Sequence, residues 1–166
     1  MLIFQVVGYK NSGKTTYISE WISYFTEKGL NVATLKHHGH GGIPKFVENT
    51  DTAKHAQAGA VMTGVEGDGS FQLSIKQQSW NMDQLLAFYR MMDIDLLILE
   101  GFKEYDFPKI VLIRDELDLP LLNRVTNVEA VITTIQLDKT DDHCPIFKPT
   151  DTEKIKEWLA EHLLSQ

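Results

Sequence analysis

The sequence predicts an α/β protein with a mostly parallel central sheet, an inserted antiparallel hairpin and helices on both faces. An apolar run at residues 2–7 is followed at once by a glycine-rich loop at residues 8–15. An amphipathic stretch comes next and stops at Gly29, and a second short apolar run follows at residues 31–35. Strand, loop, helix and strand make a βαβ unit, so the two strands should be parallel and joined by a right-handed crossover.

The glycine-rich loop matches the phosphate-loop pattern GxxxxGK[ST], which makes a phosphate-loop NTPase domain the expected fold. A loop that turns from a strand into a helix points backbone N–H groups and the positive end of the helix dipole at one place, where an anion can bind. Lys14 would reach the outer phosphates and the Thr15 hydroxyl would hold Mg²⁺. The competing interpretation is a chance Gly-Lys-Thr loop. The expected nucleotide contacts are Gly8, Lys10, Asn11, Ser12, Gly13, Lys14, Thr15 and Thr16.

The remaining chain alternates strands and helices. Residues 60–65 and 71–76 read as two strands of a hairpin, which we expect to add an antiparallel edge and make the sheet mixed. A helix should begin near Asn81, and strands are predicted at residues 95–101, 109–114, 128–135 and 145–148. Residues 117–122 read as irregular, and a last helix follows Thr150. No linker or repeat is evident, so one domain over residues 1–166 is expected.

Composition limits the partners. The net charge of −7 at pH 7 argues against binding to nucleic acid or to an anionic membrane, because such partners need clustered positive charge. The single cysteine, Cys144, cannot form an internal disulfide. The apolar start lacks a basic region and is too short for a signal peptide, and no apolar stretch has the length of a membrane span. A cytoplasmic protein is expected.

A second informative element is the strand at residues 95–101, which ends in Glu100 and Gly101. An acidic residue at the end of a buried aliphatic strand, followed by glycine, is typical of the magnesium-binding carboxylate of phosphate-loop NTPases. Glu100 would then neighbour Thr15 and hold Mg²⁺ directly or through water. The alternative is a glutamate that simply faces solvent at a strand end.

Three other positions keep more than one interpretation. The loop with His37, His38 and His40 could contact nucleotide or substrate, bind a metal, or be an ordinary solvated loop. Asp51 could cap a short helix, as could Thr50, or reach the magnesium shell. Asp141 ends a run, Asp-Lys-Thr-Asp, that is similar to the NKxD guanine-reading motif but departs at its first position, so base reading competes with a plain acidic turn.

With these residues in place, the chain resembles the MobB family of molybdopterin-guanine dinucleotide biosynthesis adaptors. The resemblance covers nearly the whole chain, and Glu-Gly-Phe-Lys at residues 100–103 is its most specific part. The other segments that carry it are residues 8–16, 35–37, Asp51, residues 58–60, and Pro108 with Lys109.

The resemblance implies a GTP-binding accessory protein of molybdenum cofactor biosynthesis, with Mg²⁺, a homodimer and weak GTP hydrolysis. It also implies assistance to the guanylyltransferase MobA, which joins GMP to molybdopterin. The region from His37 to Asp51 would respond to the γ-phosphate or contact the pterin partner. Neither a water-orienting glutamine nor an arginine finger is identifiable, which agrees with slow hydrolysis, and no catalytic residue is assigned.

Three alternatives stay open. One is a nickel-insertion GTPase that uses the histidines at positions 37, 38 and 40, and another is a small-molecule kinase that presents ATP to a hydroxyl acceptor. The third is an interaction module whose phosphate loop binds no nucleotide.

Overall fold

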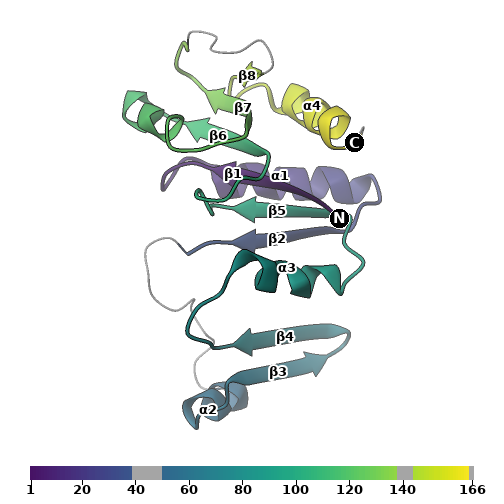
Figure 1. Cartoon of the computed structure of the whole chain (residues 1–166). Helices are drawn as coiled ribbons and strands as arrows, with labels where there is room; N and C mark the ends of the chain where they lie inside the picture. The colour runs from purple at the N-terminus through teal and green to yellow at the C-terminus, as the bar shows by residue number, and fades with distance from the viewer. Residues whose placement is uncertain (39–49, 138–143, 165–166) are drawn as a thin grey trace. The chain divides into compact units, whose positions relative to one another are not determined.

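The computed structural model describes residues 1–38, 50–137 and 144–164 (Figure 1). The chain divides into two compact units. Unit 1 holds residues 1–39 and 89–166, and unit 2 holds residues 40–88. The organisation as one domain over residues 1–166 stays a prediction.

Unit 1 is built on a parallel sheet with the strand order β2-β5-β1-β6-β7-β8 (Figure 1). A strand is present for each apolar run that predicted one in this unit. The central strands are buried on both faces, which explains their nearly continuous apolar sequences. Their bounds are β1 Leu2–Val7, β2 Val32–Lys36, β5 Leu96–Glu100, β6 Lys109–Ile113, β7 Val128–Thr133 and β8 Ile146–Phe147.

Helices lie on both faces of this sheet, as predicted. Helices α1 (Lys14–Glu27) and α4 (Thr152–Leu164) contribute Trp21, Phe25 and Leu159 to a core on one face, together with Phe4 and Ile98 from the strands. The opposite face carries the 3₁₀ helix η1 (Glu116–Leu121), in a segment expected to be irregular. Among the described helices, none is long and apolar enough to cross a membrane.

Unit 2 contains α2 (Asp51–Gln57), the hairpin strands β3 (Met62–Gly67) and β4 (Ser70–Ile75), and most of α3 (Met82–Arg90). The hairpin confirms the predicted antiparallel pair, but the expectation that it joins the central sheet is wrong. Within the described residues β3 and β4 form a separate two-stranded sheet, and every pairing in the larger sheet is parallel. Asp68 and Gly69 both have positive φ, 50° and 74°, so a tight turn closes the hairpin on itself.

Candidate functional site

The phosphate loop connects β1 to α1 and depends on glycine at two positions. A Cβ on Gly8 would lie 2.4 Å from Ser12 Oγ and 3.2 Å from Leu112 Cβ, so no side chain fits there. Gly13 caps the helix with φ of 84°, a left-handed conformation that costs a side-chain-bearing residue about 1–2 kcal/mol. Asn11 also has positive φ, 64°. These backbone angles let the loop curve back on itself before the helix begins.

The first turn of α1 is left open to an anion. No side chain caps this end of the helix, and no acidic residue lies in its first turn. The first N–H groups of a helix have no partner within the helix, and the helix dipole makes this end positive. The end that follows the glycine-rich loop is therefore a suitable site for phosphate.

Lys14 is held inside the curve of the loop. Its Nζ donates to the carbonyl oxygens of Gly8, at 3.0 Å, and Tyr9, at 2.7 Å. A third contact reaches Ser12 Oγ at 3.2 Å. The ammonium group is thus fixed by its own loop, next to the first turn of α1, and an incoming phosphate would replace at least one of these three contacts.

Further charges surround Lys14. Burial lowers the pKa of Lys14, the negative charge of Glu100 opposes this, and Lys103, Lys36 and Arg114 lower it further. Positive charge is therefore concentrated around the loop of a chain whose net charge is −7. Like charges held together are unfavourable until a counter-charge binds. A polyanion is the ligand that would relieve this repulsion.

Glu100 lies where the sequence predicted a metal-binding carboxylate. It ends β5, with Val6 of β1 beside it on one side and Lys36 of β2 on the other. Its side chain is only 12% exposed, and Oε1 accepts a hydrogen bond from Lys36 Nζ at 2.8 Å. The solvent-facing alternative therefore does not describe it. Its role with Thr15 in holding Mg²⁺ stays a prediction, and Lys36 would compete with the cation for the same oxygen.

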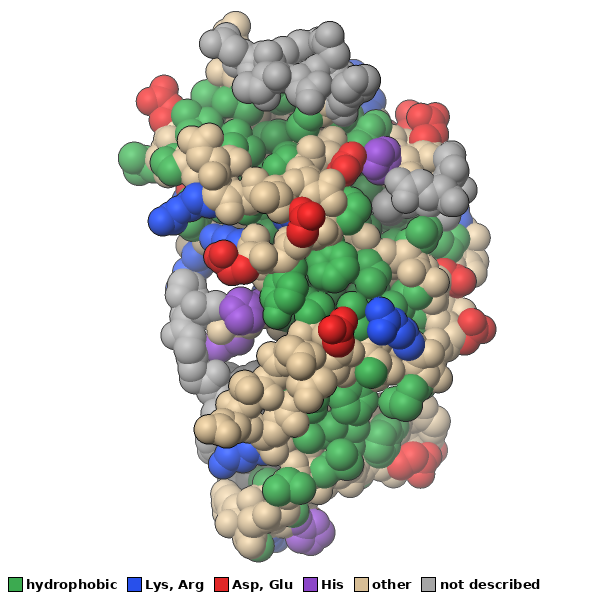
Figure 2. Space-filling model, in the orientation of Figure 1, with side chains coloured by type: hydrophobic (Ala, Val, Ile, Leu, Met, Phe, Trp, Pro, Cys, Tyr) green, Lys and Arg blue, Asp and Glu red, His purple; other side chains and the backbone are tan. Residues whose placement is uncertain are grey.

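The loop after β5 is fastened to the phosphate-loop strand. Gln5 of β1 is fully buried, and its Nε2 donates to the carbonyl oxygen of Gly101 at 2.7 Å and to that of Phe102. Lys103 Nζ lies 4.2 Å from the centre of the Tyr9 ring, a cation–π contact with the phosphate loop itself. Figure 2 shows hydrophobic side chains gathered over the sheet of unit 1, with charged and histidine side chains among them.

His37 contacts the end of β5 and the loop that follows it. Its backbone N donates to the carbonyl oxygen of Glu100 at 2.9 Å, and its ring lies 5.0 Å from that of Phe102. His40 lies outside the described residues. Within the part of the chain that the structure describes, no group of three or more His, Cys, Asp or Glu side chains could hold a metal ion. A nucleotide contact by His37 stays a prediction.

Neither candidate aspartate is placed relative to the phosphate loop by the described structure. Asp51 belongs to unit 2, where Thr50 caps α2 by accepting from Ala53 N at 3.2 Å. Asp51 itself pairs with Lys54 at 2.9 Å. Thr50 is therefore the cap, and a contact of Asp51 with nucleotide or Mg²⁺ stays a prediction. Asp141 lies outside the described residues, so base reading by it stays a prediction too.

A cavity of about 470 Å³ opens beside the phosphate loop. It runs from the loop and α1 across the carboxyl ends of the parallel strands, where ligands of open α/β sheets bind. A nucleoside could lie here while its phosphates meet the loop. Residues that mark its extent are Asn11, Gly13 and Thr16 at the loop, and Arg114, Thr134 and Pro149 at the strand ends.

Sequence reasoning missed several residues of this site. Gln5 stood out only as a polar residue within an apolar run, which the structure explains by its bonds to the loop after β5. Lys36 and Arg114 each come at or just after the end of a strand. Their position at the carboxyl edge of the sheet was the available signal, but a single charged residue at a strand end is common.

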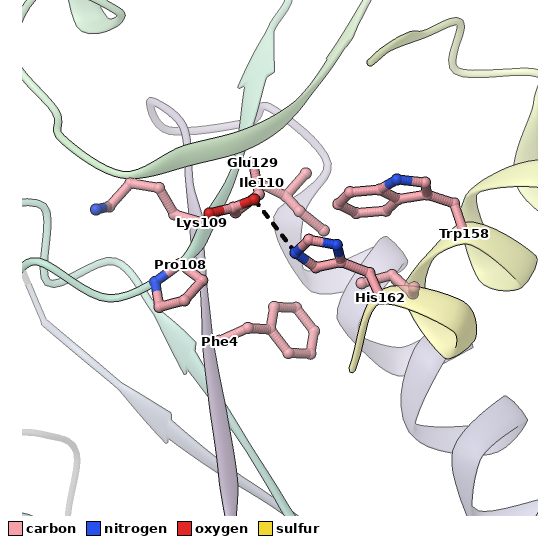
Figure 3. A pocket seen from close by; sticks show the side chains of 8 residues that line it. Phe4, Pro108, Lys109, Ile110, Glu129, Trp158 and His162 are labelled. Carbon is pink, nitrogen blue, oxygen red and sulfur yellow. Dashed lines mark ion pairs between the residues drawn. The ribbon is translucent and has the colours of Figure 1, made fainter. Parts of the chain in front are cut away.

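A second cavity lies away from the phosphate loop and measures only about 10 Å³, room for about one water molecule (Figure 3). It is formed near Phe4 and Pro108, where Trp158 and His162 of α4 stack at 4.8 Å. His162 Nε2 lies 3.2 Å from Glu129 Oε2. This cavity is too small for a nucleotide.

Comparison with known proteins finds related sequences. The model of the family MobB, molybdopterin guanine dinucleotide synthesis protein B, matches residues 3–134. A probable molybdopterin-guanine dinucleotide biosynthesis adapter protein of Bacillus subtilis is 39% identical over 151 residues, which cover 90% of this chain and 86% of that protein. An adapter protein of the same pathway from Haemophilus influenzae is 28% identical over 138 residues, covering 81% and 77%.

Solved structures are similar over the whole length. The crystal structure of Bacillus subtilis MobB superposes with a TM-score of 0.85 at 37% identity and covers 98% of each chain. That of a MobB protein homolog from Bacillus stearothermophilus gives 0.81 at 36% identity and covers 100% of each.

The geometry of the loop after β5 can be tested by substituting Gly101. Its φ is +88°, and an added Cβ would lie 3.3 Å from His37 Cβ. We expect Gly101→Ala to lower the free energy of unfolding by about 1–2 kcal/mol, measured by urea denaturation, because alanine is strained in this conformation. Gly67→Ala is the control, since a Cβ there would meet nothing within 4 Å. Equal effects of the two substitutions would contradict a special requirement at Gly101.

Proposed function

Because this chain belongs to the MobB family, we propose that it binds GTP with Mg²⁺ and serves a molybdopterin guanylyltransferase as an accessory protein in molybdenum cofactor biosynthesis. The observation that carries the proposal is the phosphate loop itself. Lys14 is fixed within it, the uncapped first turn of α1 follows it, and the Glu100 carboxylate stands beside it. The names of the relatives, adapter proteins of this pathway, support the accessory role.

The donor set fits a nucleotide with its metal. In the proposed complex Lys14 and the loop amides bind phosphate oxygens, and Thr15 and Glu100 provide oxygen ligands of the kind that Mg²⁺ prefers. The metal would neutralise phosphate charge. The other loop positions, Lys10, Asn11, Ser12 and Thr16, would line the path of the phosphates, and Gly101 with His37 would lie next to the outermost one.

In this role the protein mainly binds GTP and assists the guanylyltransferase, and it hydrolyses GTP only slowly. Slow hydrolysis is consistent with a sequence in which no water-orienting glutamine and no arginine finger are identifiable. Guanine selectivity would rest on Asp141, the predicted base reader. The protein would act in the cytoplasm, with molybdopterin held by the guanylyltransferase or between the two proteins.

Lys14→Ala should weaken binding of GTP with Mg²⁺ by roughly 10–100-fold, because the charge-assisted hydrogen bonds that it removes are worth about 1.5–3 kcal/mol. Isothermal titration with GTP and with ATP measures this loss and the base preference together. Lys28→Ala removes the same charge at the other end of α1 and should bind as the native protein does. Native protein that binds no nucleotide would refute the proposal, as would undiminished binding by Lys14→Ala.

The accessory role predicts an effect on the partner reaction. With a purified molybdopterin guanylyltransferase, molybdopterin and limiting GTP, adding this protein should increase the yield of the guanine dinucleotide, and Lys14→Ala should not. The yield can be followed by chromatography of the released cofactor. An acceptor-dependent turnover of ATP by this protein alone would indicate a kinase instead.

We also propose a homodimer, and the hairpin of unit 2 supports it. Met62, Phe71 and Leu73 lie on one face of the two-stranded sheet and are 53%, 63% and 41% exposed. An isolated hairpin is marginally stable, and a patch of exposed apolar side chains marks an interaction site. A second copy of the chain would cover this face.

Light scattering coupled to size-exclusion chromatography tests the dimer. Native protein should have twice the mass of one chain, and the double variant Phe71→Glu/Leu73→Glu should have the mass of one, because charge on an apolar contact is costly to bury. Met91→Glu/Met92→Glu is the matched control, since these side chains are 74% and 66% exposed and lie in unit 1. A monomeric native protein would contradict the proposal, and so would dissociation only in the control.

A further inference from the structure

Arg114 and Asp118 form a two-pronged ion pair at the end of β6. The Asp118 carboxylate accepts from Arg114 Nε at 2.8 Å and from Nη2 at 3.0 Å. The same carboxylate accepts from the backbone N of Arg114 at 3.1 Å. Three hydrogen bonds donated by Arg114 to one carboxylate fix both the plane of the guanidinium and the backbone that carries it. These hydrogen bonds lower the pKa of Asp118.

The two partners differ in their access to solvent. The Asp118 side chain is 3% exposed and lies in η1, whereas that of Arg114 is 40% exposed. Nη1 of Arg114 donates to none of the residues that the structure describes. A buried carboxylate therefore holds two of the three guanidinium nitrogens, and the third is presented outward in a fixed direction.

The place of Arg114 in the fold is next to the phosphate loop. β6 pairs with β1, with Val111 beside Val7, so the residues after β6 run alongside the loop that follows β1. Arg114 lines the large cavity together with Asn11, Ser12 and Gly13 of that loop. Its charge also contributes to the lowered pKa of Lys14, which shows that the two cations are within electrostatic reach.

We propose that Arg114, oriented by Asp118, is a nucleotide-binding residue that donates from Nη1 to the phosphate chain. This inference rests on the proposed nucleotide binding and adds a specific donor to it. A rigid, planar cation at this position can approach a phosphate oxygen without losing side-chain entropy on binding, because Asp118 has already fixed it. Asp118 is then a positioning residue that acts through the arginine.

The alternative is that the pair only fastens η1 to β6. A pair of this kind adds little stability by itself, since burying the carboxylate costs about as much as the pairing returns. The two interpretations differ in what the variants change. A fastening role affects stability alone, whereas a binding role affects the affinity of the folded protein for phosphate-bearing ligands.

Equilibrium titration with GTP and Mg²⁺, at a temperature where all variants are folded, distinguishes the fastening role from the binding role. We expect Arg114→Ala to weaken binding about tenfold or more, Arg114→Lys to recover part of the loss, and Asp118→Asn to weaken it by a smaller factor. Arg124→Ala, the same change of charge at an exposed position in the turn after η1, should bind as the native protein does. Thermal unfolding of each variant reports any loss of stability separately.

Competition with guanosine, which lacks phosphate, provides the second readout. If Arg114 meets the phosphate chain, Arg114→Ala and native protein should bind guanosine equally. Unchanged GTP affinity in folded Arg114→Ala or Arg114→Lys overturns the inference and leaves the proposed function standing. An equal loss for guanosine and GTP also overturns it, because the contact would then be with the nucleoside. If the native protein binds no nucleotide, the proposed function fails and this inference fails with it.

Discussion

The parallel pairing of β1 with β5 on one side and β6 on the other is the constraint on which the candidate site depends. Parallel strands end at the same edge of a sheet, so the loops that follow them meet there whatever their separation in the chain. The register places Glu100 beside Val6 and Val111 beside Val7. The strand pairing therefore brings a phosphate loop, a carboxylate and an arginine to one edge of the sheet.

Positive charge is concentrated at that edge of the sheet. The chain as a whole is acidic, but Lys36, Lys103 and Arg114 all act on Lys14, with Glu100 as the opposing charge. The pairing of Glu100 with Lys36 lessens the repulsion within this group, although Lys36 is well exposed and so holds the carboxylate weakly. A triphosphate with its metal would change both relations at once, since it offers anionic oxygens to the lysines and a cation to the carboxylate.

Buried polar contacts hold the loops of the site in place. Gln5 and Asp118 are both almost completely buried, and each makes its hydrogen bonds to a segment that leaves the end of a neighbouring strand. Leaving the Gln5 Nε2 group or the Asp118 carboxylate buried without a partner would be costly, so their bonds favour one loop conformation. The loop after β5 is consequently held by a buried side chain of the sheet, and the segment after β6 by a buried side chain of η1.

The sequence determined the local features because their signals are short-ranged. Residues 2–7 and 8–16, the helix that follows and the turn at Asp68 are specified by apolar pattern, glycine and helix-end chemistry within a few residues. Glu100 was found for the same reason, since an acidic residue at the end of an aliphatic run is a local pattern. Membership of the MobB family also followed from short segments.

Only the tertiary structure decided which segments meet. That the hairpin pairs with itself, that Gln5 holds the loop at Gly101, and that Arg114 lies next to the phosphate loop all depend on strand order and register. Those are set by the burial of whole faces over a chain of 166 residues. Hydrophobic burial is nondirectional, so the identity of a strand's neighbour cannot be read from its own sequence.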